Sequence, residues 1–575
     1  MREILSKYRR YLTNYEALLP YSILGVIGGI ASGLVVLAFE HAIVQVGTIL
    51  GVGNGGEAFE DLPYWMAFAL PAGGAIALGF LYTLLKPEDR ETGIVHVVSR
   101  MHSHYGVLPL RNAVLQFFAG TFALATGQSG GREGPGVHLG GAINSLFGQR
   151  MGLPNNSLRT LVACGTAGGI AAAFHTPLAG VIFAMEVIVM EYSVAGFIPV
   201  IVAAVAASAI SLSLSGGEPI LAIPAVELNS LLEIPYVLLL GLFCGVVMAM
   251  FIRIMRLCAS YAHLPVALRF TLAGLLTGAI ALAAPETLGL GYDSLGQILS
   301  GQLAVQALLL LAACKVVATA VTCGVGMPVG IIGPSLLIGA CIGGALGAIA
   351  HALHPQIASD MPLYIAVGMA ATMAAVLNAP LAAILAVIEL TQTISIGLPA
   401  LLAVVAASLT NTALFRQRSA YDVVLRQLQR VVPSDPLNQL LHRTDVTATM
   451  DVRVVHVPIA LERTEFDPLL EFTPAWCLIE RDGQDLYLVS GIELLDWLRE
   501  APADEEVADI SEAPIRRFTI APVPLQASLR QAMDAIRNNT VEAVSVYERS
   551  RATGKRILHG VVTQESIEKF TLGRL

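Results

Sequence analysis

Charged residues are scarce in most of this 575-residue chain, and they are unevenly distributed. Only 13% of all residues are charged, about half of the roughly 25% that is usual in a soluble domain. The first 415 positions hold 34 of the 77 charged residues, whereas the last 160 hold 43. This disfavours a soluble enzyme. It predicts a long membrane part followed by a polar, soluble-looking part.

The sequence also lacks a basic excess and any close pairing of cysteines. The formal net charge is −9, and nucleic-acid binding requires a basic surface, so no nucleic-acid partner is expected. The seven cysteines are scattered without a C-x-x-C pair, which indicates neither a disulfide framework nor a metal site. The N-terminus has no apolar run ending at a small-residue cleavage site, so positions 1–20 are expected to remain as a cytoplasmic segment.

Long apolar runs recur from about position 21 to 415. Several are longer than the roughly 20 residues that a straight span needs, or are interrupted by Gly and Pro, so tilted, broken or re-entrant helices are expected. Basic residues precede the first run and follow the last. This places both termini in the cytoplasm and implies an even number of crossings. We expect an integral, multi-pass protein of the plasma (inner) membrane, with the lipid bilayer as its surroundings.

The apolar part contains an internal repeat. The stretch ACGTAGGIAAAFHTPLAGVIFAME at 163–186 matches AVGMAATMAAVLNAPLAAILAVIE at 366–389, with Pro-Leu-Ala and the final Glu in register. Upstream, GREGP at 131–135 matches GIIGP at 330–334. Two related halves in one membrane domain are typical of transporters and channels whose site lies between the halves. Small-residue helix packing is the alternative cause of the Gly and Ala matches.

The first loop of this repeat, GREGP, places an Arg and a Glu inside an apolar segment. Charged side chains in a membrane are costly, so the pair indicates a functional site. The glycines let the backbone approach a ligand, and the proline suits the first turn of a helix whose free N–H groups attract anions. The Glu133 carboxylate would mimic a permeating anion, able to occupy the site or leave it on protonation. The alternative is that Arg132 and Glu133 only neutralise each other.

The second loop, GIIGPSLLIG at 330–339, is another glycine-flanked helix start, and it has no acid at the position that matches Glu133. Two helix N-termini directed at one point form a site for a small anion without a full positive charge. A simple helix kink is the alternative.

Together these motifs resemble those of the CLC family of chloride channels and chloride/proton exchangers. GREGP is identical to the family's gating-glutamate motif, and GIIGP fits its G-x-F-x-P motif except that Ile replaces Phe. The resemblance implies that Glu133 is the external gate and that the chain forms a homodimer with one pore in each subunit. From the outer to the central anion site, the implied lining residues are Arg132, Gly134, Gly330, Ile331 and Ile332.

A third family element, G-S-G-I-P, is matched only loosely by ETGIV at 91–95. Thr92 keeps the hydroxyl that would contact a central anion, but Glu91 brings a carboxylate to the inner mouth. Tyr421, just after the last apolar run, matches the family tyrosine that completes the central site. The alternatives are that Thr92 is only a helix N-cap and that Tyr421 is an interfacial-belt tyrosine.

The segment PLAGVIFAMEV at 177–187 concerns proton coupling. In many exchangers of the family, a second acid follows the one matched by Glu186 and relays protons on the inner side. Here that position is Val187, which carries no proton and favours a channel. Glu191, one turn further along, is an acid that could substitute. Because Glu186 recurs as Glu389, we expect it to have a structural role in hydrogen bonding at a helix end.

After position 415 the pattern changes to short strands and amphipathic helices. The segment 515–570 reads strand, Pro-containing loop, helix, strand, strand and then GVVT before another helix, which resembles a CBS motif. The segment 452–498 resembles a degenerate partner, and the acidic stretch APADEEVAD at 501–509 separates the two. Such a pair binds an adenine nucleotide or braces a dimer. No other cofactor is expected.

The expected fold is therefore an all-α polytopic membrane protein with inverted internal repeats and broken or re-entrant helices, followed by an α/β CBS (Bateman) domain. The expected ranges are a membrane domain at 21–415, repeats at about 21–215 and 234–415, a linker at 416–443 and a CBS pair at 444–575.

The expected function is a gated chloride channel, voltage- or proton-dependent, with Glu133 as its gate and chloride or a similar small anion as substrate. A chloride/proton antiporter that uses Glu133 as external proton acceptor is the alternative, and the altered ETGIV element leaves fluoride open as the anion. A CBS-bearing cation transporter is a remote alternative, because cation sites need converging oxygen ligands. No enzyme activity is expected, since no nucleophile–base set appears in the sequence.

Overall fold

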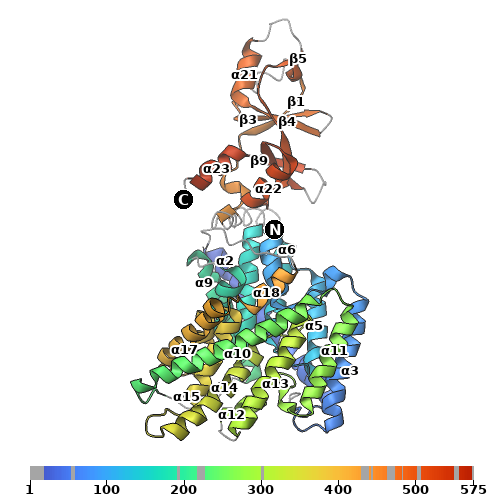
Figure 1. The fold of residues 1–575 in the computed structure, drawn as a ribbon. Helices are drawn as coiled ribbons and strands as arrows, with labels where there is room; N and C mark the ends of the chain where they lie inside the picture. Colours follow the sequence, from blue (N-terminus) through green and yellow to red (C-terminus); the bar gives the residue numbers. More distant parts are fainter. Residues whose placement is uncertain are drawn as a thin grey trace. The chain divides into compact units, whose positions relative to one another are not determined.

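The computed structural model describes residues 18–53, 58–190, 194–216, 227–299, 303–428, 440–441, 444–462, 473–481, 484–500, 507–549 and 556–572. The chain divides into two compact units. The membrane unit comprises Glu16–Met151 and Leu158–Val432, and the second unit consists chiefly of Pro433–Leu575. Both are drawn in Figure 1.

The membrane unit consists of helices. Those of its first half are α2 (Leu18–Ile49), α3 (Tyr64–Thr83), η1 (Pro87–Arg90), α4 (Gly93–Ser103), α5 (Leu110–Ala125), α6 (Glu133–Met151), α7 (Asn155–Phe174), α8 (Pro177–Phe183), the π-helical η2 (Ala184–Val189) and α9 (Val194–Ser215). Those of its second half are η3 (Leu231–Glu233), α10 (Ile234–Ser260), α11 (Val266–Ala281), η4 (Pro285–Thr287), α12 (Tyr292–Leu299), α13 (Val305–Gly324), α14 (Ile332–Leu353), α15 (Met361–Leu377), α16 (Pro380–Thr391), η5 (Ile394–Ile396), α17 (Gly397–Leu409), η6 (Thr410–Leu414) and α18 (Ala420–Gln427). Among the described residues, eight helices are long and apolar enough to cross a membrane.

Two of the longest apolar runs are broken at matching points, as the sequence predicts. The run at 159–190 divides between α7 and α8, and the run at 362–391 divides between α15 and α16. In each case a residue with positive φ ends the first helix, His175 at 57° and Asn378 at 55°. Pro177 or Pro380 then opens the second helix. A left-handed residue terminates a helix and Pro cannot continue one, so the same local chemistry breaks both halves.

Each half also contains one long, closely packed helix pair. In the first half, glycines of α2 face the backbone of α9: Gly29 meets Ala203, and Gly33 meets Ala207. In the second half, glycines of α10 face the backbone of α17 in the same manner, at Ala403 and Ala407. Without a Cβ the backbones approach closely, which is how helices associate in a membrane. The repeat in the sequence is therefore also a repeat in packing.

Helices α6 and α14 begin in the interior of the membrane unit. Their first residues, Glu133 and Ile332, are 0% and 1% exposed. The first N–H groups of a helix have no partner within it. Two such ends inside one unit therefore form an electropositive environment away from bulk water.

The second unit is α/β. Its elements are η7 (Val446–Ala448), β1 (Val454–Pro458), β2 (Ala460–Glu462), β3 (Trp476–Arg481), β4 (Gln484–Ser490), α21 (Gly491–Glu500), β5 (Val507–Asp509), η9 (Ile510–Glu512), β6 (Arg517–Phe518), β7 (Ile520–Pro524), α22 (Leu529–Asn539), β8 (Ala543–Arg549), β9 (Arg556–Thr563) and α23 (Gln564–Leu572). One sheet has the order β1-β3-β4-β6 and another the order β7-β8-β9, while β2 pairs with β5. Strand β7 is parallel to β8, and β8 is antiparallel to β9.

The order β7, α22, β8, β9, α23 agrees with the strand and helix order predicted from 515–570. The acidic stretch 501–509 is not wholly a separator, however. Its last three residues form β5, which pairs antiparallel with β2 in the first motif. Ala508 on β5 is buried, so this end of the stretch belongs to a small sheet despite its acidic composition.

Candidate anion site

The two signature loops of the repeat are joined to each other by backbone hydrogen bonds. The N–H of Gly131 donates to the carbonyl of Gly330 at 2.8 Å, and the N–H of Gly330 donates to the carbonyl of Gly131 at 2.7 Å. A Cβ added to Gly134 would lie 2.8 Å from the Cα of Gly330, too close for any side chain. The glycines therefore let the starts of α6 and α14 meet.

The Glu133 carboxylate lies at this junction. The hydroxyl of Tyr292 donates a hydrogen bond of 2.9 Å to one of its oxygens. A Cβ added to Gly131 or Gly333 would meet the same carboxylate, so glycines of both loops surround it. The carboxylate thus occupies the place between the two helix starts where a small anion would be attracted.

Arg132 forms its ion pair with an acid on another helix. Its guanidinium forms an ion pair of 3.2 Å with Glu40 on α2 and donates to the carbonyl of Ala173 at 3.1 Å. It also lies 5.2 Å from the centre of the Tyr292 ring. Glu40 therefore supplies a counter-charge to Arg132, which argues against the alternative in which Arg132 and Glu133 only neutralise each other.

Glu40 and Tyr292 are the residues that sequence reasoning missed. Glu40 is the sole Asp, Glu, Lys or Arg in the 32 residues of α2, and an isolated acid in an apolar helix is a signal that could have identified it. No comparable signal marks Tyr292. It approaches Glu133 from α12, 159 residues away along the chain.

A cavity of about 410 Å³ in the membrane unit reaches the signature loops. It is lined by many residues of the membrane unit, among them five that the sequence predicts for the anion site: Thr92, Gly134, Gly330, Ile331 and Tyr421. Arg132 and Ile332 are not among the lining residues. The charged side chains that line it are Arg90, Glu91 and Arg269.

Thr92 and Tyr421, the two hydroxyl residues predicted for the anion site, both line this cavity. Thr92 is the N-cap residue of α4, but its side chain forms no capping hydrogen bond. The first helical amide, that of Gly93, instead donates to Gln116 at 2.7 Å. The Tyr421 hydroxyl is buried and has no hydrogen-bond partner within the described part of the chain. Neither the capping role of Thr92 nor an interfacial position for Tyr421 accounts for this arrangement.

The acids at the ends of the repeated segments bind each other's helices. One Glu389 oxygen accepts from the N–H of Leu178 at 3.0 Å and the other from Ala179 at 2.8 Å, at the start of α8. Glu186 accepts in the same way from the amides of Leu381 and Ala382 at the start of α16. A carboxylate on a helix N-terminus is favourable. Glu186 thus has the helix-end geometry expected of a structural residue.

Val187 follows Glu186 in the π-helical turn η2 and is buried. It offers no proton-carrying group. Glu191, the predicted substitute, lies outside the described residues.

This arrangement, in which two structural repeats bring two helix N-termini together, is typical of membrane transport proteins. The family model described as "Voltage gated chloride channel" matches residues 73–412. The chain therefore belongs to this family, the CLC family, and is an integral, multi-pass membrane protein.

Two relatives match over most of their length. A protein of Ralstonia nicotianae named "Putative chloride channel protein ClcB-like" is 33% identical over 402 residues, 68% of this chain and 93% of the relative. The "H(+)/Cl(-) exchange transporter ClcA" of Vibrio cholerae is 31% identical over 439 residues, 74% of this chain and 90% of the relative.

Solved structures share the fold. A slow cyanobacterial Cl−/H+ antiporter superposes with a TM-score of 0.62 at 24% identity, covering 71% of this chain and 97% of its own. A eukaryotic CLC transporter superposes with a TM-score of 0.60 at 20% identity and covers 96% of this chain, so its likeness extends into the C-terminal α/β unit.

Proposed function

We propose that the chain carries chloride across the membrane by way of the cavity lined by Thr92 and Tyr421, with the Glu133 carboxyl as the gate. The observation that carries this proposal is the position of the carboxylate between the joined loops. While it is ionised it takes the place of an anion, and once it is protonated it no longer competes for the helix N-termini. The gate is therefore opened by protons or by anions that displace the carboxylate.

The test is the Glu133→Gln substitution in proteoliposomes. Glutamine has the shape of the acid without its charge, so chloride efflux is expected to be high and independent of pH between acidic and neutral values. The matched control is Glu40→Gln, which alters the partly buried acid that pairs with Arg132. If efflux by the Glu133 variant keeps the pH response of the unaltered chain, Glu133 is not the gate.

The second candidate is the coupled mode, chloride/proton exchange, in place of a passive channel. Val187 favours the channel, because the inner relay acid is missing. Two observations favour exchange: the relative named as an exchange transporter is 31% identical, and the superposed cyanobacterial structure is named as an antiporter. An outward chloride gradient that drives protons uphill supports exchange, whereas brisk chloride flux without proton movement supports the channel.

We also propose a homodimer with one pore in each subunit, plasma (inner) membrane location with both termini in the cytoplasm, and binding of an adenine nucleotide by the CBS pair. These proposals follow from the family resemblance and from the charge distribution at the two ends of the apolar part. The order β7, α22, β8, β9, α23 in the last motif of the second unit supports the CBS assignment.

A further inference from the structure

Two buried histidines extend from the cavity towards the gate helix. His96 on α4 and His138 on α6 are 3% and 0% exposed. The Nδ1 atom of His96 lies 2.8 Å from Nε2 of His138. On its other side, Nε2 of His96 lies 3.7 Å from a carboxylate oxygen of Glu91. Glu91 and His96 both line the cavity, so the three side chains form a continuous line from the cavity to α6.

The end of this line at α6 is a buried nitrogen of His138 that makes no hydrogen bond within the described part of the chain. Nδ1 of His138 has no hydrogen-bond partner among the described residues, and an unsatisfied buried polar atom costs free energy. His138 lies one turn after Gly134, which lines the cavity. It is five residues after Glu133, about 7.5 Å along the helix axis, so water would have to carry the proton between the two side chains.

We propose that Glu91, His96 and His138 form a proton relay that takes the place of the acid missing at Val187. The relay rests on the exchange mode proposed above. Imidazole suits this task because it accepts a proton at one nitrogen and releases one from the other.

Each step conserves the proton. At the start His96 holds its proton on Nδ1 and His138 holds its own on Nδ1. Glu91 gives a proton to Nε2 of His96, which becomes a cation. The Nδ1 proton of His96 then passes to Nε2 of His138, and His138 releases its Nδ1 proton towards the gate. Both rings end neutral with the proton on Nε2, and each regains the starting tautomer by losing its Nε2 proton to water and taking one proton from water at Nδ1.

The test uses isosteric amides that keep the hydrogen bond between the two positions. Glutamine places its amide nitrogen near Nε2 of a histidine, and asparagine places it near Nδ1, so His138→Gln and His96→Asn are the two variants. Neither amide carries a proton through the pair. His102→Asn is the matched control, because His102 lies on α4 and its Nδ1 contacts the carbonyl of Val98 at 2.9 Å.

Chloride efflux and proton movement are recorded together in proteoliposomes under a chloride gradient. We expect His138→Gln and His96→Asn to reduce proton flux at least about tenfold. Chloride flux should stay within about twofold in His138→Gln, because His138 is not among the lining residues of the cavity, and the control should change neither flux. If the unaltered chain couples protons to chloride and both variants couple as well as it does, the relay is wrong while exchange stands. If the unaltered chain moves chloride without protons, exchange fails and the relay fails with it. Should one variant fail to fold, the other carries the test.

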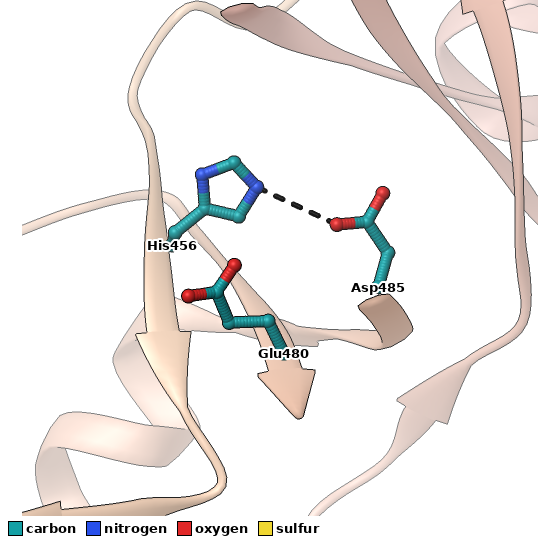
Figure 2. A group of neighbouring side chains, drawn as sticks. All are labelled: His456, Glu480 and Asp485. Carbon is teal, nitrogen blue, oxygen red and sulfur yellow. Dashed lines mark ion pairs between the residues drawn. The ribbon is translucent and has the colours of Figure 1, made fainter. Parts of the chain in front are cut away.

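A different observation in the second unit points to a metal site. His456 on β1, Glu480 on β3 and Asp485 on β4 direct ligand atoms towards one another, all within 4.8 Å (Figure 2). Nε2 of His456 lies 3.5 Å from Asp485. Glu480 and Asp485 are directly opposed partners on antiparallel strands, where like charges repel. A cation between them would relieve this repulsion.

We propose that these three side chains bind a divalent transition-metal ion of the zinc or manganese kind. One imidazole nitrogen and two carboxylates are the donors such ions take. The hydroxyl of Tyr547 on β8 donates to Asp485 at 2.8 Å, as outer-shell groups do around metal ligands. It also lies 3.1 Å from Nε2 of His456, a contact that an ion bound at this nitrogen would replace. Because β8 belongs to the second motif, an ion here would link the two motifs.

Zinc binding to the purified full chain tests this site, by calorimetry and by the thermal melt of tryptophan fluorescence. Trp476 and Trp497 lie in this unit. We expect zinc to raise the melting temperature, and His456→Gln and Asp485→Asn to weaken binding at least about tenfold, as loss of a ligand does. The control is His559→Gln, since His559 pairs with a single carboxylate, that of Glu548. Undiminished binding by both ligand variants, or no binding by the unaltered chain, overturns the proposal.

Discussion

The two halves of the membrane unit open a helix from the same kind of loop, yet only one of these loops carries an acid. Gly131 and Gly330 bond to each other symmetrically, and α6 and α14 both begin in the interior. The first helical residue is Glu133 in one half and Ile332 in the other. The comparison teaches that the halves share the backbone that joins the two helix starts, while a single side chain, the Glu133 carboxylate proposed as the gate, distinguishes them.

A second pair of segments is more symmetric. Glu186 and Glu389 each bind the opposite short helix, and each is followed by a buried aliphatic residue, Val187 or Leu390. In this pair the halves stabilise each other. This symmetry is the physical reason to place the proton path elsewhere than at Glu186.

The largest expected effect comes from adding a methyl group where the loops meet. In Gly134→Ala the new Cβ would lie 2.8 Å from Cα of Gly330, so the loops must separate. We expect chloride flux to fall at least about tenfold, since a displaced site loses most of its interactions. The control is Gly136→Ala on the same helix, where the nearest atom would be 3.6 Å away. Equal flux from both variants would contradict the close joining of the loops.

The comparison between the loops is sharpened by moving the acid from one to the other. Glu133→Gln combined with Ile332→Glu places a carboxylate at the start of α14 in place of α6. Because the two loops are joined symmetrically, we expect efflux at neutral pH to fall several-fold below that of Glu133→Gln alone and to recover at acidic pH. An unchanged efflux would show that the two helix starts are not equivalent for an anion.

The reciprocal carboxylates provide a matched pair for stability. Glu186→Gln and Glu389→Gln each replace a charged acceptor of two amides by a neutral one. We expect each to lower the free energy of unfolding by about 1–2 kcal/mol, since hydrogen bonds to charged groups are the stronger ones. The melting temperatures should fall alike, with chloride and proton fluxes unchanged. A loss of proton flux in the Glu186 variant alone would assign it a relay role.

The smallest expected effect concerns Asp445 in the second unit. It is compared with Glu186 and Glu389 of the membrane unit, which accept hydrogen bonds from backbone amides. Burial raises the pKa of this carboxyl from its ordinary 3.8 to about 8. The folded state therefore binds this proton more tightly than the unfolded state does. The contribution of the protonated Asp445 to the free energy of unfolding is complete below about pH 4 and is lost as the pH rises towards 8. Asp445→Asn should raise the melting temperature of this unit by a few degrees at pH 8 and by little at pH 4. Tryptophan fluorescence at both pH values measures the melting temperature. The same change in melting temperature at pH 4 and pH 8 would contradict the raised pKa of Asp445.

Much of the site could be predicted because its residues lie in short contiguous motifs. GREGP and GIIGP each combine the glycines and the helix start in five positions, and GREGP also carries the acid. The repeat then predicts that the two motifs meet. Long-range partners could not be predicted in this way. Glu40 reaches Arg132 from α2, and Tyr292 reaches Glu133 from α12, because packing of distant helices decides which side chains become neighbours.

The sequence by itself determined the membrane class, the two related halves and the strand and helix order of the last α/β motif. These follow from composition, register and local chemistry, which need no knowledge of distant contacts. Only the tertiary structure decided that Arg132 pairs with Glu40 and that His96 contacts His138. It also decided that Glu186 and Glu389 each accept hydrogen bonds from the start of the short helix in the other half. Each of these contacts joins positions that are tens to hundreds of residues apart, and only packing of the helices brings such positions within hydrogen-bond distance.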